Sequence, residues 1–211
     1  MDHSTSPARR RLRLHDASSA APARARRGER GISIVEAAFV TPVFFMLVLG
    51  LIELGLYMND YLAAANTVRA GARVASSSGN DIYADYGIAQ AVNRESAAIP
   101  RGQLQYVVVY KANGFGAAPS ATCKAGTRVN NSCNVYRPAD LDKPKAKWGC
   151  IAGEALDDAW CPTTRKVSST GTGSEYVGIY VKVSHPWVTK MFGTQKDISD
   201  TSVIRLEPRQ F

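Results

Sequence analysis

RRGERGISIVEAAFVTPVFFMLVLGLIEL, residues 26–54, is the stretch of this 211-residue chain that decides the fold. A helix over its apolar part, residues 37–56, would be about 30 Å long at 1.5 Å per residue. That length equals the thickness of the hydrocarbon core of a bilayer. The sequence therefore predicts one transmembrane helix over residues 32–58. Pro42 lies inside this segment and predicts a helix kink, which a membrane helix tolerates where neighbouring groups satisfy the freed backbone.

Two other interpretations of this stretch are weaker. A chain of this length offers few domains large enough to surround so apolar a helix in a soluble core. A cleaved secretory signal would carry its small-residue cleavage site just after the apolar run. Here the small residue, Gly31, comes before the run.

The segment before the helix, residues 1–31, is strongly basic. Its first 30 residues contain eight arginines against three acidic residues, whereas the whole chain has a net charge of +8. This leader lacks aromatic residues and cannot build a core, so we expect it to be disordered. By the positive-inside rule, basic residues directly before an apolar helix keep the N-terminus in the cytoplasm and export the C-terminal part of the chain. The same position argues against nucleic-acid binding as the role of the arginines.

Glu36 places a carboxylate in the first turn of the apolar run. A charge in hydrocarbon costs a few kcal/mol on insertion scales, so such a residue predicts a function. If the chain is cut after Gly31, Ile32 gains an ammonium group one helical turn before Glu36. The carboxylate can then pair with that group or with its equivalent in a neighbouring subunit. The alternative is that Glu36 extends to the lipid headgroups at the cytoplasmic boundary.

Three stretches carry a family resemblance. The G-x-x-x-x-E spacing from Gly31 to Glu36 resembles a class III prepilin signal, and VEAAFVTP, residues 35–42, resembles the V-E-F-A-L-x-x-P box of TadE-like tight-adherence (Tad) pilus proteins. ANTVRAGARVAS, residues 65–76, resembles the A-x-x-x-R-x-G-A-R-x-A stretch of the same family. The closing SVIRLEP, residues 202–208, resembles its last strand.

The resemblance implies a minor pilin or pseudopilin with a single pass through the inner membrane. Its N-terminus would be cytoplasmic, and its C-terminal domain periplasmic or otherwise extracytoplasmic. A prepilin peptidase would cut between Gly31 and Ile32, and Glu36 would serve charge pairing during assembly. The implied partners are that peptidase, other pilin or pseudopilin subunits, the membrane platform of a Tad system and membrane lipid, without nucleic acid.

Beyond the membrane, residues 59–78 are rich in alanine and predict that the helix continues as a stalk. Their small side chains suit either a contact face between subunits or an exposed stalk. The break at residues 76–81 predicts a helix stop at Gly79, with Asp81 as the N-cap of a second helix over residues 83–98.

The exported domain, residues 79–211, is predicted to be α+β. Alternating β-branched and aromatic residues predict strands at 104–111, 176–184 and 198–206. Such strands form a small pilin-like domain in which a helix packs on an antiparallel sheet of about three strands. The stretch between the first two strands, residues 112–174, is polar, and we expect an insertion loop there.

All four cysteines lie in this insertion, at Cys123, Cys133, Cys150 and Cys161. No C-x-x-C pair occurs, so a zinc or thiol-redox site has little support, whereas two disulfides suit an exported loop. Three pairings exist. Local closure favours Cys123 with Cys133 and Cys150 with Cys161.

Features of a catalytic site are sparse. His3 and His15 lie in the leader, and His185 ends a predicted strand, where a structural role is expected. No nucleophile-elbow, zinc-protease or phosphate-loop motif occurs. The adjacent Asp157 and Asp158 lack the further oxygen ligands of a cation site. We therefore predict a protein that is not an enzyme, with no metal and no cofactor.

A second class of function stays open at this stage. The chain would be an uncleaved, membrane-anchored extracytoplasmic binding or adhesion protein whose insertion, residues 112–174, recognises a ligand or surface. The two hypotheses differ at the bond between Gly31 and Ile32. Glu53 lies near the far, extracytoplasmic end of the predicted span. We expect its side chain to extend to the lipid headgroups, and we assign it no role.

Overall fold

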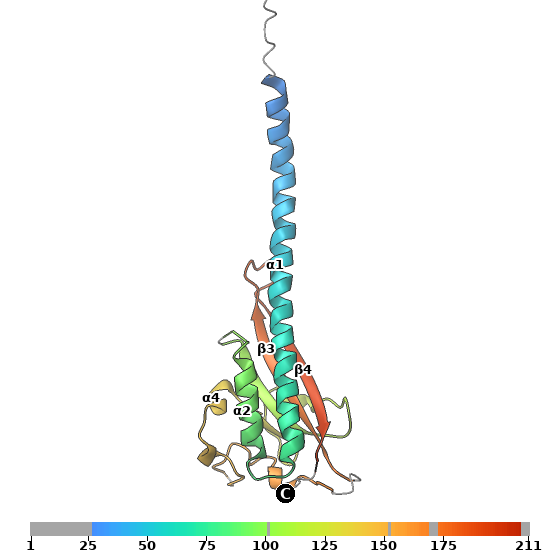
Figure 1. Cartoon of the computed structure of the whole chain (residues 1–211). Helices are drawn as coiled ribbons and strands as arrows, with labels where there is room; N and C mark the ends of the chain where they lie inside the picture. Colours follow the sequence, from blue (N-terminus) through green and yellow to red (C-terminus); the bar gives the residue numbers. More distant parts are fainter. Residues whose placement is uncertain (1–26, 101, 152, 169–172, 208–211) are drawn as a thin grey trace, which may run out of the picture. The chain divides into compact units, whose positions relative to one another are not determined.

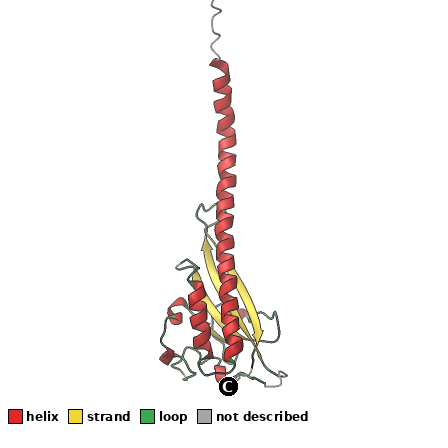
Figure 2. Cartoon of the chain, in the orientation of Figure 1, coloured by secondary structure: helices red, strands yellow, loops and turns green. Residues whose placement is uncertain are grey.

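The membrane-length segment and the predicted stalk form one 52-residue helix, α1, Arg27–Ser78 (Figures 1 and 2). The computed structural model describes residues 27–100, 102–151, 153–168 and 173–207. Most of the basic leader, residues 1–26, lies outside this part of the chain. The chain divides into two units, residues 1–44 and 45–211.

In the first unit, the described residues all belong to α1, and Pro42 lies within it. Where their side chains are described, from Ser33 onward, they are exposed, including large apolar ones such as Phe39 and Phe44. Among the described residues, α1 is the one helix long and apolar enough to cross a membrane. Exposed apolar side chains on every face are what a lipid-facing helix requires.

The turn after α1 agrees with the prediction in part. Gly79 has a φ of +56° and stops the helix. The second helix, α2, Ala84–Ser96, begins with Tyr83 as its N-cap, so the expectation that Asp81 is the N-cap is wrong. The Asp81 carboxylate instead accepts a hydrogen bond from the Tyr83 backbone N–H at 2.8 Å and orders the turn before the helix.

The sheet has four antiparallel strands in the order β2-β1-β3-β4. The strands are β1, Leu104–Ala112; β2, Cys133–Tyr136; β3, Tyr176–Pro186; and β4, Gln195–Arg205. The α+β prediction is confirmed, and the three predicted strands are present. The fourth strand, β2, lies outside the prediction because it has only four residues and belongs to the polar insertion.

One face of the sheet is covered by α2 and the C-terminal half of α1 (Figure 1). The alternating residues Val107 and Val109 of β1, with Ile179 and Val181 of β3, point into this core. The small residues of α1 that face it are Ala63, Ala64, Ala72 and Ala75. These alanines form neither an exposed stalk nor a contact face between subunits, because they are buried in the domain's own core.

The insertion between β1 and β3 also differs from the expected loop. It contains two short helices, α3, Ala121–Lys124, and α4, Pro138–Leu141, and two 3-10 turns, η1, Lys145–Lys147, and η2, Pro162–Thr164. Its buried side chains include two tryptophans, Trp148 and Trp160. The insertion is therefore part of the domain core, because both of these large apolar side chains are turned inward.

Candidate functional site

The predicted cleavage and assembly residues lie on the N-terminal part of α1. The backbone at Gly31 and Ile32 is helical, and Glu36 is exposed. Glu36 lies four positions after Ile32 in the helix, an axial rise of about 6 Å. A new ammonium group at Ile32 would thus be one turn from the Glu36 carboxylate. Cleavage, charge pairing and a kink at Pro42 stay predictions.

Glu53 does not extend into solvent or toward headgroups as expected, because only 1% of its surface is exposed. Its carboxylate accepts a hydrogen bond from the backbone N–H of Thr189, in the loop between β3 and β4. This loop folds back on α1 and supplies the donor. The partner is 136 residues away in the chain, so no local sequence pattern indicates it.

Asp60 and His185 form a second buried contact between α1 and the end of β3. The Asp60 carboxylate lies 2.7 Å from His185 Nδ1, and both side chains are almost fully buried. Between the two acids, Tyr57 contacts the His185 ring edge-on and stacks on Trp187 at 5.6 Å. Glu53, Tyr57 and Asp60 have the i, i+4, i+7 spacing of one helix face. That spacing is the sign in the sequence that these three side chains lie on one face of α1, where they contact the end of β3 and the loop after it.

An apolar groove lies beside this contact. Its volume is about 490 Å³. The groove is lined by Met46, Leu47, Gly50, Leu51 and Leu54 of α1 together with Trp187 and Phe192 of the β3–β4 loop.

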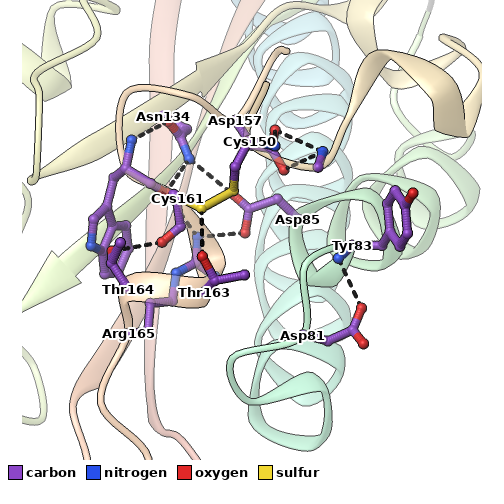
Figure 3. The surroundings of a disulfide bond; sticks show 12 residues. Asp81, Tyr83, Asp85, Asn134, Cys150, Asp157, Cys161, Thr163, Thr164 and Arg165 are labelled. Carbon is purple, nitrogen blue, oxygen red and sulfur yellow. Dashed lines mark hydrogen bonds and ion pairs between the residues drawn. A yellow bond between two sulfur atoms is a disulfide. The ribbon is translucent and has the colours of Figure 1, made fainter. Parts of the chain in front are cut away.

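A buried ion pair joins α2 to the insertion beside a disulfide (Figure 3). Arg165 Nη2 lies 2.6 Å from Asp85 Oδ1, and both side chains are fully buried. The other Asp85 oxygen accepts hydrogen bonds from Tyr136 Oη at 2.6 Å and Asn134 Nδ2 at 2.9 Å. Burial, and then the Asp85 carboxylate, raise the pKa of the Tyr136 hydroxyl well above its usual value. We call these four residues the Asp85 network.

The carboxylates of the adjacent residues Asp157 and Asp158 both interact with other groups of the same chain. Asp157 accepts hydrogen bonds from the backbone N–H groups of Gly149 and Cys150 at 3.0 Å. Burial raises the pKa of the Asp157 carboxyl, while these two N–H groups act in the opposite direction. Asp158 lies 3.3 Å from Arg128. Through Gly149, Cys150 and Gly153, both carboxylates are hydrogen-bonded to the loop around the second disulfide.

The structure contains the cysteine pairing that local closure favours. One disulfide joins Cys123 to Cys133, and the other joins Cys150 to Cys161. The first packs in the core on the second face of the sheet. The second lies beside the Asp85 network (Figure 3).

The R-x-G-A-R motif lies where α1 packs on the domain. A Cβ added at Gly71 would lie 3.0 Å from a methyl carbon of Val92 and 3.3 Å from one of Ile179. Glycine therefore permits the close approach of α1 to α2 and β3. Arg69 and Arg73 are exposed on another face of α1 and line a polar hollow.

The model of one protein family matches a large part of α1. Residues 31–73 match the family of TadE-like proteins. The resemblance predicted from the sequence is thereby confirmed over residues 31–73, and the predicted resemblance of residues 202–208 lies outside the match. No curated protein and no solved structure matches the chain.

The TadE-like segment begins at Gly31 and includes Glu36, Pro42 and Arg73. It covers about one fifth of the chain and lies within α1. The match and the apolar helix together fit a component of a Tad pilus. The Asp85 network and both disulfides lie outside the TadE-like segment, so the family match says nothing of their role.

Proposed function

We propose that the chain is a minor pilin or pseudopilin of a Tad pilus or a related secretion system. The observation that carries the proposal is the family match, which starts at the glycine of the predicted cleavage site and continues along α1. The bond between Gly31 and Ile32 is the site of cleavage by a prepilin peptidase. The mature chain then joins other pilin or pseudopilin subunits at the membrane platform of the Tad system.

In this proposal, the chain has four functional segments. Residues 1–31 are the leader that is removed, and residues 32–58 cross the inner membrane. Residues 59–78 connect the membrane helix to the domain, and residues 79–211 form the extracytoplasmic domain. The basic leader supports the orientation with a cytoplasmic N-terminus, because the positive-inside rule favours it.

Glu36 supplies recognition between subunits in this proposal. An exposed carboxylate on an apolar helix is unfavourable in lipid unless a cation pairs with it. The N-terminal ammonium group of a neighbouring subunit is such a cation. Assembly therefore aligns one subunit against the next at the helix position where the two charges meet.

The test is a Glu36→Gln variant of the full chain, expressed in a Tad-bearing host that lacks its own copy. We expect normal insertion in the membrane fraction, and roughly tenfold less chain in the assembled fraction, because a lost charge-assisted hydrogen bond is worth about 1.5–3 kcal/mol. Glu36→Asp keeps the charge and serves as the matched control, with most assembly retained.

Equal assembly of the Glu36→Gln variant and the wild-type chain would contradict the proposed charge pairing. Uncleaved wild-type chain that stays in the membrane, absent from every assembled fraction, would instead support the anchored binding protein.

A further inference from the structure

The loop between β3 and β4, residues 187–194, which we call the hairpin tip, carries more exposed apolar surface than a solvated turn needs. The exposed fractions are 73% for Val188, 46% for Met191 and 59% for Phe192. Surface loops are usually polar, and apolar side chains gathered in one short loop mark an interaction surface.

The hairpin tip is fixed to α1 rather than free in solvent. Thr189 donates its backbone N–H to Glu53, and Trp187 stacks on Tyr57. Trp187 and Phe192 also line the apolar groove with residues of α1. The tip and this part of α1 therefore form one continuous apolar surface.

The α1 residues of this surface belong to the segment of membrane length. Leu47 and Leu51 in the groove are 64% and 70% exposed. Measured from residue 56, where the apolar part of bilayer length ends, Leu51 is five residues further inside the span, or about 7.5 Å along the helix. A loop that contacts this level of α1 cannot stay entirely in water while α1 crosses the bilayer.

We propose that the hairpin tip enters the outer leaflet of the membrane and that lipid acyl chains fill the apolar groove. This inference rests on the proposed membrane insertion of α1. Trp187 and Tyr57 are residue types that prefer the membrane–water interface. The exposed Lys190 lies in the same loop, and its long side chain can reach the headgroups while its neighbours enter the hydrocarbon.

The same arrangement explains the buried Glu53. A bare carboxylate at this level of the span would cost a few kcal/mol in hydrocarbon. The hairpin tip covers it and supplies a backbone N–H as hydrogen-bond donor. The tip is therefore both a second membrane contact and the cover for a polar group within the span.

The test uses single introduced cysteines in the full chain, each labelled with an environment-sensitive fluorophore. All four native cysteines are in disulfides, so an added thiol is labelled selectively. The probe positions are Val188→Cys in the tip, Leu51→Cys on α1 and Phe115→Cys. Phe115 is the matched control, because it is an equally exposed apolar residue, at 70%, in a loop outside the tip.

The labelled chains are reconstituted in phosphatidylcholine vesicles with and without spin-labelled acyl chains. We expect roughly twofold quenching at residues 188 and 51, as for groups some 5–10 Å inside the headgroup boundary. Residue 115 should show none.

Quenching at residue 51 without quenching at residue 188 would overturn the inference and leave the membrane helix intact. Absence of quenching at residue 51 would contradict the membrane insertion of α1 itself, and the inference with it. Efficient cross-linking of residue 188 to a second copy, without lipid quenching, would assign the groove to another subunit and also overturn the inference.

Discussion

Arg165 and Asp85 show how a single buried charge pair ties the insertion to the helical layer. Both side chains are withdrawn from solvent, and Arg165 also lies over the Trp160 ring at 4.2 Å. Because Asp85 accepts hydrogen bonds from Asn134 and Tyr136 as well, its charge has several partners. Removing the arginine leaves the buried Asp85 carboxylate with neutral hydrogen-bond donors and no counter-ion, which is the costly case for a buried ion pair.

We therefore expect Arg165→Met to lower the free energy of unfolding of the domain by about 3–5 kcal/mol. The matched control is Arg128→Met, which removes the half-exposed pair with Asp158 and should cost at most about 1 kcal/mol. Urea denaturation of the full chain in detergent micelles measures both. Equal stability losses in the two variants would contradict the role of the Asp85 network.

A functional residue can be identified from the sequence where it stands at a characteristic spacing from another residue. Glu36 can be singled out because it stands at a fixed distance from Gly31. Glu53 has no such local partner, since its donor, Thr189, is distant in the chain. The burial of Asp85 cannot be predicted for the same reason. The residues that stabilise its buried charge belong to β2 and to the position after η2, far away in the sequence.

Among the elements, the C-terminal half of α1 depends on small side chains for its position on the sheet. Gly71 is a point of close approach, with buried Val92 and Ile179 beside it. Both neighbours belong to the main core and have little room to move. The helix register against α2 and β3 is therefore set by glycine and alanine at this face.

Gly71→Ala should destabilise the domain by about 1–3 kcal/mol, because overpacking a filled core outweighs the better helix propensity of alanine. Gly55→Ala is the control, since no atom lies within 4 Å of an added Cβ there. Thermal unfolding monitored by near-UV circular dichroism should show a lower midpoint for the first variant only. A Gly71→Ala midpoint at or above that of the wild type would refute the close-packing explanation.

The elements themselves are largely predictable from pattern. Alternation locates β1, β3 and β4, and glycine locates the end of α1. Two features are not predictable by this means. The strand β2 is too short to show a period, and the alanines of α1 do not indicate whether their partner is another subunit or their own sheet.

Over the whole molecule, the residues that match the family and the residues that stabilise the domain are different. The TadE-like match ends at residue 73, before α2 and the sheet begin. The part beyond it is held by the main core, the Asp85 network and two disulfides. The fold class is predictable from hydrophobic periodicity, whereas the proposed function rests on a few residues at the start of α1.

The fate of the bond between Gly31 and Ile32 tests the central claim most directly. The full chain is expressed with an active prepilin peptidase, or with an inactive peptidase variant, and its N-terminus is identified by mass spectrometry. Gly31→Leu and Gly28→Leu are compared, because both replace a glycine near the helix start but only the first alters the predicted site. We expect a mature chain that begins at Ile32 for the wild type and Gly28→Leu, and no cleavage for Gly31→Leu. A wild-type chain that keeps its basic leader beside an active peptidase would contradict the proposed function.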